Sequence, residues 1–85
     1  MNLCVVSTFD CTVDDFKAMM KEYEEDMRTC VSDWEIAMVN DHKVVTMLNV
    51  TDMDAVIAIM SSPKMLERDA ANNDVDVVYS LEQID

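Results

Sequence analysis

The chain has 85 residues, a length that predicts a single domain over residues 1–85. Hydrophobic residues make up 51% of the composition, which is too large a share for a disordered chain. The 18 acidic and 6 basic residues give a net charge of −12, which argues against binding to nucleic acid or to anionic membranes, because both are bound through Lys and Arg.

An uncharged stretch at residues 3–9, rich in β-branched side chains, predicts the first strand. Because this stretch is apolar on both faces, we expect it at the centre of a sheet. Thr12 has the character of a helix N-cap, with Asp15 three residues later as in a capping box. Apolar side chains then recur at helical spacing, which predicts one amphipathic helix over residues 13–28.

Polar and apolar residues alternate over residues 33–39, which predicts a second strand, and its two charges favour an edge position. The turn-forming residues Asn40-Asp41-His42 follow. The next stretch, residues 43–50, has no charge after its first residue and predicts a central third strand. The second and third strands should therefore form a hairpin.

Asp52 is the expected N-cap of a second helix whose residues 55–60 are all apolar, so we expect this helix to be mostly buried. Ser61-Ser62-Pro63 ends it, and Pro63 suits the first turn of a further short helix. Asn72-Asn73-Asp74 predicts a turn before the fourth strand, residues 75–81. With no glycine in the chain, any positive φ must be adopted by Asn or Asp.

Each half of the chain has the order strand, helix, strand, which predicts an α+β, ferredoxin-like βαββαβ sandwich with a four-stranded antiparallel sheet. Right-handed crossovers place the helices on one face, with strands one and three in the middle. Alternation predicts an apolar sheet face under the helices, formed by Leu3, Val5, Phe9, Trp34, Ile36, Met38, Val44, Leu48, Val50, Val75, Val77, Tyr79 and Leu81.

The opposite sheet face is also rich in apolar residues: Cys4, Val6, Ala37, Val39, Val45, Met47 and Val78, alongside Thr8, Glu35, Asn49, Asp76 and Ser80. Such a patch is large for a monomer of this size. Packing two of these faces across a two-fold axis would bury it. We therefore expect a homodimer with an interface formed by Val6, Val39, Val45, Met47 and Val78.

The order of elements, the segment NVTDMDAVIAIMSSPKMLERDAANN and the ending VYSLEQI resemble the dimeric α+β barrel superfamily, the antibiotic-biosynthesis-monooxygenase-like proteins. The D-x-x-A-x-x-x-x-x-S-S-P-x-M stretch is similar to their second helix, Ser-Pro break and short third helix. The resemblance implies a dimeric α/β-barrel assembly with face-to-face sheets and a pocket between sheet and helices. It implies no single activity, since the superfamily includes cofactor-free monooxygenases, haem-degrading enzymes, isomerases and members without known activity.

The candidate pocket residues are Tyr23, Trp34 and Tyr79. In cofactor-free oxygenases of the resembled family, Trp, Asn and Tyr or His hold an aromatic substrate in the pocket between helices and sheet. Asn49 is expected on the other face of the sheet, so the full set does not assemble here. The favoured interpretation is that all three aromatics are core residues, with Trp34 a packing residue first, because aromatic side chains dominate cores in general.

The remaining residue types argue against a metal or cofactor site. His42, the only histidine, is expected to be exposed in the hairpin turn and has no Cys or Glu at zinc-ligand spacing. Three cysteines without a C-x-x-C pair predict reduced thiols. The absence of glycine excludes P-loop and Rossmann motifs, so no cofactor is predicted. No export signal or membrane span is expected, which favours the cytoplasm.

Two functional hypotheses follow. The first is a non-catalytic dimeric module with a binding or regulatory role, which recognises a small apolar ligand or a protein partner. The second is a cofactor-independent monooxygenase-like enzyme acting on a small aromatic or apolar substrate. The lack of a convergent polar constellation favours the first. A pocket of several hundred cubic ångströms holding Trp34 and Tyr79 together would favour the second.

Overall fold

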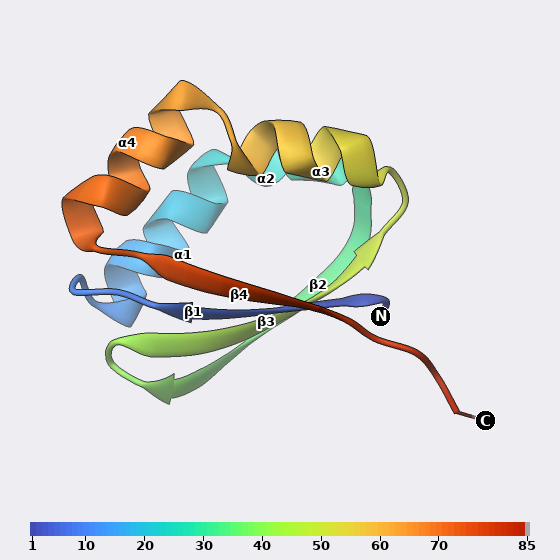
Figure 1. Ribbon diagram of the computed structural model, residues 1–85, viewed down its shortest axis with the longest axis horizontal. Helices are drawn as coiled ribbons and strands as arrows, with labels where there is room; N and C mark the ends of the chain where they lie inside the picture. The colour runs from blue at the N-terminus through green and yellow to red at the C-terminus, as the bar shows by residue number, and fades with distance from the viewer. Residues whose placement is uncertain (85) are drawn as a thin grey trace.

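The computed structural model describes residues 1–84 and contains one four-stranded antiparallel sheet in the order β2-β3-β1-β4. The elements in chain order are β1 (Leu3–Thr8), α1 (Val13–Glu22), α2 (Glu24–Arg28), β2 (Val31–Asn40), β3 (Lys43–Val50), α3 (Met53–Met60), α4 (Pro63–Asn72) and β4 (Val75–Ser80). All four helices lie on one face of the sheet (Figure 1). The predicted α+β, ferredoxin-like fold is confirmed, with β1 and β3 in the middle of the sheet.

The register of β1, β2 and β3 places the predicted apolar face of these strands on the helix side. Leu3 and Val5 of β1 pair with Leu48 and Thr46 of β3, and paired residues in an antiparallel ladder share one face. Trp34 of β2 pairs with Leu48 and therefore lies on the same face. The alternation along β1, β2 and β3 was thus sufficient to predict the orientation of these strands.

The predicted orientation of β4 is wrong. Val78 pairs with Val5, so it lies on the helix side together with Asp76. The residues expected under the helices, Val75, Val77 and Tyr79, lie on the open face instead. The alternation in β4 is real, but its more apolar side faces away from the helices. A shift of one residue exchanges the two faces of a strand, and here the turn before the strand decides which phase occurs.

The turn between α4 and β4 is held by backbone hydrogen bonds. Asn73 has φ 50°, the left-handed conformation that the absence of glycine assigns to Asn or Asp. The N–H of Asp74 donates to the carbonyl of Asp69, 2.9 Å away. This closure of the helix end determines where β4 begins and therefore which of its side chains point toward the helices.

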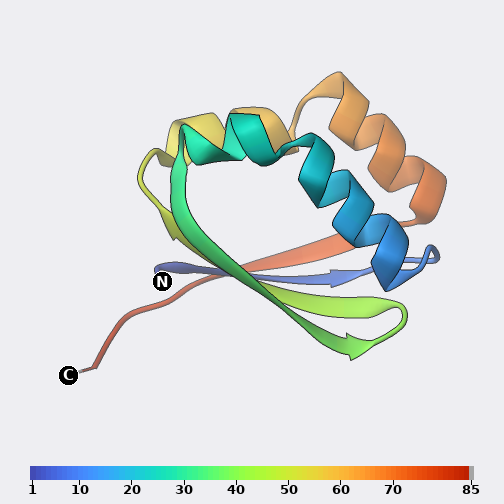
Figure 2. The same ribbon diagram turned by 180° about the vertical axis from the view of Figure 1, so that it is seen from behind.

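The segment predicted as one helix over residues 13–28 forms two helices that meet at Tyr23 (Figure 2). Tyr23 has φ −95° and ψ 3°, outside helical geometry, and its side chain is only 8% exposed. No proline or glycine marks the break. The predicted capping box of α1 is confirmed, since the Thr12 hydroxyl accepts from the N–H of Asp15 and the Asp15 carboxylate accepts from the N–H of Thr12.

The core consists of two clusters of buried side chains under the helices. The first contains Leu3, Val5, Cys30, Val31, Leu48 and Val56. The second contains Phe9, Val13, Phe16, Met19, Tyr23 and Val44. The expectation that the helix after Asp52 is mostly buried is wrong, because only Val56 of α3 is buried and Ile57 is 55% exposed. One face of α3 packs toward the sheet through Val56, and another face, which carries Ile57, is exposed.

Candidate functional site

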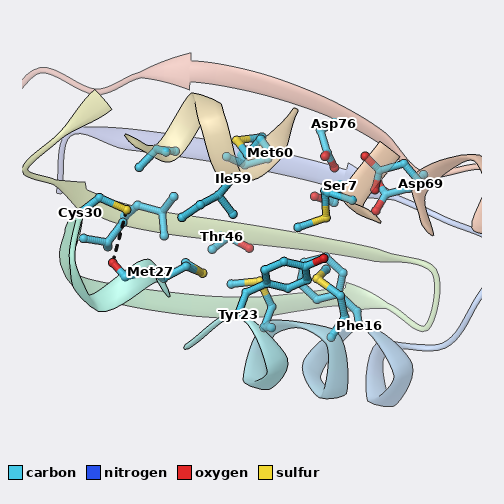
Figure 3. A pocket seen from close by; sticks show the side chains of 18 residues that line it. Ser7, Phe16, Tyr23, Met27, Cys30, Thr46, Ile59, Met60, Asp69 and Asp76 are labelled. Carbon is cyan, nitrogen blue, oxygen red and sulfur yellow. Dashed lines mark hydrogen bonds between the residues drawn. The ribbon is translucent and has the colours of Figure 1, made fainter. Parts of the chain in front are cut away.

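A cavity of about 90 Å³ lies between the helices and the inner face of the sheet (Figure 3). Its lining is contributed by all four helices, by β1, β2, β3 and β4, and by the turns at Cys30 and Asp74. The space between sheet and helices is therefore not completely filled. The volume is well below the roughly 300–1,000 Å³ of a drug-sized ligand site, although it exceeds the space that a single water needs.

The walls of the cavity are apolar and rich in sulfur. Five of the nine methionines line it: Met19, Met20, Met27, Met60 and Met65. Methionine side chains are unbranched and have three rotatable bonds, so they can repack around guests of different shape. Phe16 and Ile59 complete the apolar surface, and the Cys30 thiol closes one end by donating to the carbonyl of Met27, 3.5 Å away (Figure 3). The cavity can thus enlarge around an apolar guest.

The other end of the cavity carries three carboxylates from three segments: Asp69 of α4, Asp74 of the turn and Asp76 of β4. One oxygen of each lies within 4.8 Å of the others. Ser7 of β1 is the register partner of Asp76 and is 2% exposed. The same end therefore holds three acceptors on one side and a buried hydroxyl next to them (Figure 3).

The crowding of these carboxylates changes their protonation. Burial, a hydrogen bond with Asp76 and the charges of Asp76 and Asp69 together raise the pKa of Asp74 to about 8. Burial and the charge of Asp76 also raise the pKa of Asp69. Each cause disfavours the charged form, so near neutral pH the unliganded cluster retains a proton.

Several polar atoms around the cavity are buried without a hydrogen-bond partner among residues 1–84. They are the hydroxyl of Tyr23, the hydroxyl of Thr46 and one carboxylate oxygen of Asp74. Tyr23 is 8% exposed and Thr46 is 4% exposed, and both line the cavity. A buried polar atom without a partner typically costs about 1–3 kcal/mol, so three of them around one cavity require an explanation.

The three predicted pocket residues do not come together. Tyr23 lines the cavity. Trp34 lies on the helix side of β2 but packs against the first core cluster, and it borders a separate surface depression with Glu24 and Arg28. Tyr79 lies on the open face of the sheet and is 53% exposed, because β4 has the opposite phase from the predicted one. Trp34 and Tyr79 therefore do not line a common pocket.

The predicted interface residues are similarly divided by the register. Val6 and Val45 pair on the open face, and Met47 lies on that face opposite Cys4. Val39 is exposed beside a register shift in β2. Val78 lies on the helix side, so it is not part of the open face. Val75, Val77 and Tyr79 take its place, which makes the open face more apolar than predicted.

The carboxylate cluster was missed because Asp76 was expected on the open face. Asp69, Asp74 and Asp76 are five and two positions apart in the sequence, a spacing that matches neither one helix face nor a known ligand motif. They come together across the left-handed turn at Asn73. The signal present in the sequence was a charged residue inside an otherwise apolar strand. His42, exposed as expected, has its Nδ1 2.9 Å from the carbonyl oxygen of Cys11, away from the cavity.

None of the helices in residues 1–84 combines the length and apolar character needed to cross a membrane.

No family model matches the chain, and no curated protein matches it. Among solved structures, it is similar to SnoaB, a cofactor-independent oxygenase from Streptomyces nogalater, with a TM-score of 0.63 and 13% identity over 96% of this chain and 92% of that chain. A variant of SnoaB gives a TM-score of 0.61 and 14% identity over 96% and 94% of the two chains. The structure of Rv0793 from Mycobacterium tuberculosis gives a TM-score of 0.50 and 12% identity over 100% of both chains.

These similarities cover nearly the whole chain and establish its fold. The protein has a ferredoxin-like α+β fold, as the sequence pattern predicted. At 12–14% identity the comparison extends to the fold and not to an activity.

Proposed function

We propose that this protein is a small-molecule binding module that takes a small, largely apolar ligand into the cavity between sheet and helices. The observation that carries the proposal is the cavity itself, whose apolar walls lead to buried polar atoms without a hydrogen-bond partner in the described part of the chain. A ligand with a polar end would satisfy these atoms and remove their energetic cost.

The size of the cavity limits the ligand. A cavity of roughly 150 Å³ accommodates benzene, whereas this one measures about 90 Å³ before any adjustment of its walls. The five methionines can supply the remaining space by changing rotamer. A compound with one ring or a short alkyl chain fits this range better than a multi-ring substrate.

A second candidate function is a cofactor-independent oxygenase reaction on such a ligand. It is favoured by the fold shared with SnoaB and by the position of Asp74 at the end of the cavity, where a carboxyl with a pKa of about 8 suits proton transfer near neutral pH. The separation of Trp34 and Tyr79 from the cavity speaks for binding alone as the primary proposal.

We further propose that the protein is a homodimer whose open sheet faces pack together. The support is the continuous apolar surface formed across β3, β1 and β4 by Val45, Met47, Cys4, Val6, Val75, Val77 and Tyr79. Exposed apolar patches of this kind mark interaction sites in soluble proteins. A two-fold axis through the sheet would cover this surface with a second copy of itself.

The methionines provide a direct test of binding. Methyl-labelled methionine gives nine NMR signals, of which five report on the cavity. Met1, Met38 and Met53 lie elsewhere and serve as internal controls, and Met47 lies on the open sheet face. We expect titration with phenol or indole to shift the cavity signals saturably and leave Met1, Met38 and Met53 in place. The proposal fails if no apolar probe shifts the cavity signals, or if only the control signals move.

The matched variant is Ile59→Phe, which fills the cavity from α3. It should abolish the saturable shifts, whereas Ile57→Phe, two residues earlier on the exposed side of the same helix, should leave them unchanged. To separate the second candidate, the bound probe is incubated with air and the protein. Consumption of oxygen that depends on the protein would favour the oxygenase over binding alone.

A further inference from the structure

We propose that the ligand carries a positively charged amino group, which the carboxylates of Asp69, Asp74 and Asp76 bind at the polar end of the cavity. This inference rests on the proposed function and adds the chemical class of the ligand: a small apolar amine in its ammonium form. Two independent observations support it. The first is the arrangement of the carboxylates, and the second is the set of buried hydroxyls nearby.

The three carboxylates converge although like charges repel. Their oxygens lie within 4.8 Å of one another. An ammonium group donates three hydrogen bonds, and acceptor oxygens placed tetrahedrally at about 2.8 Å from its nitrogen are about 4.6 Å apart. The three carboxylates are thus close enough for one ammonium group to reach all of them, and the hydrogen bond between Asp74 and Asp76 draws these two closer than that spacing.

The buried hydroxyls point to the same kind of ligand. The hydroxyls of Tyr23 and Thr46 belong to side chains that are more than nine-tenths buried, line the cavity and have no hydrogen-bond partner among residues 1–84. In Figure 3 the Tyr23 hydroxyl is directed toward the end of the cavity where Ser7 and Asp69 lie. Hydroxyls and carboxylates all accept hydrogen bonds, so each of these groups can accept from the N–H groups of an ammonium head group.

No side chain among residues 1–84 neutralises the cluster from inside the cavity. Its lining contains no Lys, Arg or His. Arg68 lies beside Asp74 on the outer side, in a separate depression, but its guanidinium is paired with Glu22. Lys64 stands over the ring of Tyr23, 5.6 Å from its centroid, and not at the carboxylates. The negative charge is therefore left for a ligand.

An organic cation fits the site better than a metal ion. Ca²⁺ takes roughly six to eight oxygen ligands, whereas only three carboxylates converge here among residues 1–84. A bare ion would also leave the adjoining apolar cavity unused. An amine with an apolar body occupies both parts, since its head reaches the carboxylates while its body contacts the methionines.

Binding of the amine should depend on pH. An ammonium ligand competes with the proton held by Asp74, so its affinity should fall as the pH is lowered from 8 to 6. The ionisable groups that surround Asp74 are Asp69 of α4, Asp76 of β4, and Cys11, Asp15 and Arg68, which line the depression on its other side. Among the residues that line the cavity, Asp69 and Asp74 have a raised pKa, and burial is the largest cause for both.

The test compares two probes of equal shape, 2-phenylethylamine and 2-phenylethanol, by the methionine NMR titration at pH 8. We expect the amine to bind at least about tenfold more tightly than the alcohol, since hydrogen bonds between charged groups are the stronger ones. Asp69→Asn and Asp76→Asn should reduce this ratio to near one. Asp41→Asn in the exposed β2–β3 turn makes the same change in net charge and should leave the ratio unchanged.

The outcomes separate this inference from the proposed function. If both probes bind equally, the amine inference is wrong and the binding module stands. If neither probe binds, both are wrong. If Ca²⁺ or Mn²⁺ shifts the signals and the amine does not, the cluster is a metal site and the inference is overturned. Replacing Asp by Asn removes repulsion from the cluster, so the variants should remain folded, which a thermal melt verifies.

Discussion

At the scale of single residues, the most informative position is Asp76. In sequence it is one charge within the apolar alternation of β4, and it faces the helices because Ser7 is its register partner. There it meets Asp69 and Asp74. Trp34 differs from Asp76 in this respect. It was a candidate for ligand contact in the sequence, but in the structure it packs against the first core cluster.

Asp74 makes the stability of the protein depend on pH. Its pKa is raised from 3.8 in the unfolded chain to about 8 in the folded state, so the folded state binds the proton more tightly. Stability should therefore be higher near pH 5 and fall as the pH rises toward 8. Asp74→Asn should flatten this slope and raise the melting temperature at pH 8. Thermal melts of both proteins between pH 4 and 9 would show it, and parallel curves would contradict it.

At the scale of elements, the end of α4 controls the phase of β4. The Asn73 N–H donates to the carbonyl of Ala70 and the Asp74 N–H to that of Asp69, which ends the helix in a left-handed residue. The strand that follows then begins with Val75 on the open face. A local backbone conformation thus decides which side chains reach the cavity.

Asn73 should therefore be sensitive to side-chain shape. Asn73→Gly retains access to positive φ and should leave stability nearly unchanged, whereas Asn73→Val should cost about 1–2 kcal/mol, because a β-branched residue is strained in the left-handed region. Urea denaturation measures the difference. Equal midpoints for the two variants would show that the turn does not require φ 50° in solution.

At the scale of the whole molecule, one sheet has two apolar faces and only one set of helices. The helices cover the centre of the inner face, while Met38 on β2 and Val78 on β4 remain exposed, and the cavity lies between the helices and the sheet. The open face contains Val6, Val45 and Met47, and the phase of β4 adds Val77 and Tyr79 to it. A second copy of the chain is the partner that we propose for this face.

The dimer proposal predicts a mass near twice the 9.7 kDa of the chain by sedimentation equilibrium at micromolar concentration. Val45→Asp and Met47→Lys should each dissociate the dimer, because each would place an unpaired charge in a buried interface. Ile57→Asp on the outer side of α3 is the matched control and should leave the mass unchanged. A parent protein that sediments as a monomer would contradict the proposal.

The sequence by itself determined the order of the elements, the central positions of β1 and β3, the caps of the helices and the face that β1, β2 and β3 turn to the core. These features depend on local chemistry and on periodicity, which neighbouring residues carry. Three features were decided only in the tertiary structure: the break at Tyr23, the phase of β4 and the convergence of Asp69, Asp74 and Asp76. The break at Tyr23 and the convergence of the carboxylates depend on how segments distant in the chain pack, whereas the phase of β4 depends on the conformation of the turn at Asn73. Where both faces of a sheet are apolar, alternation alone does not show which face turns inward.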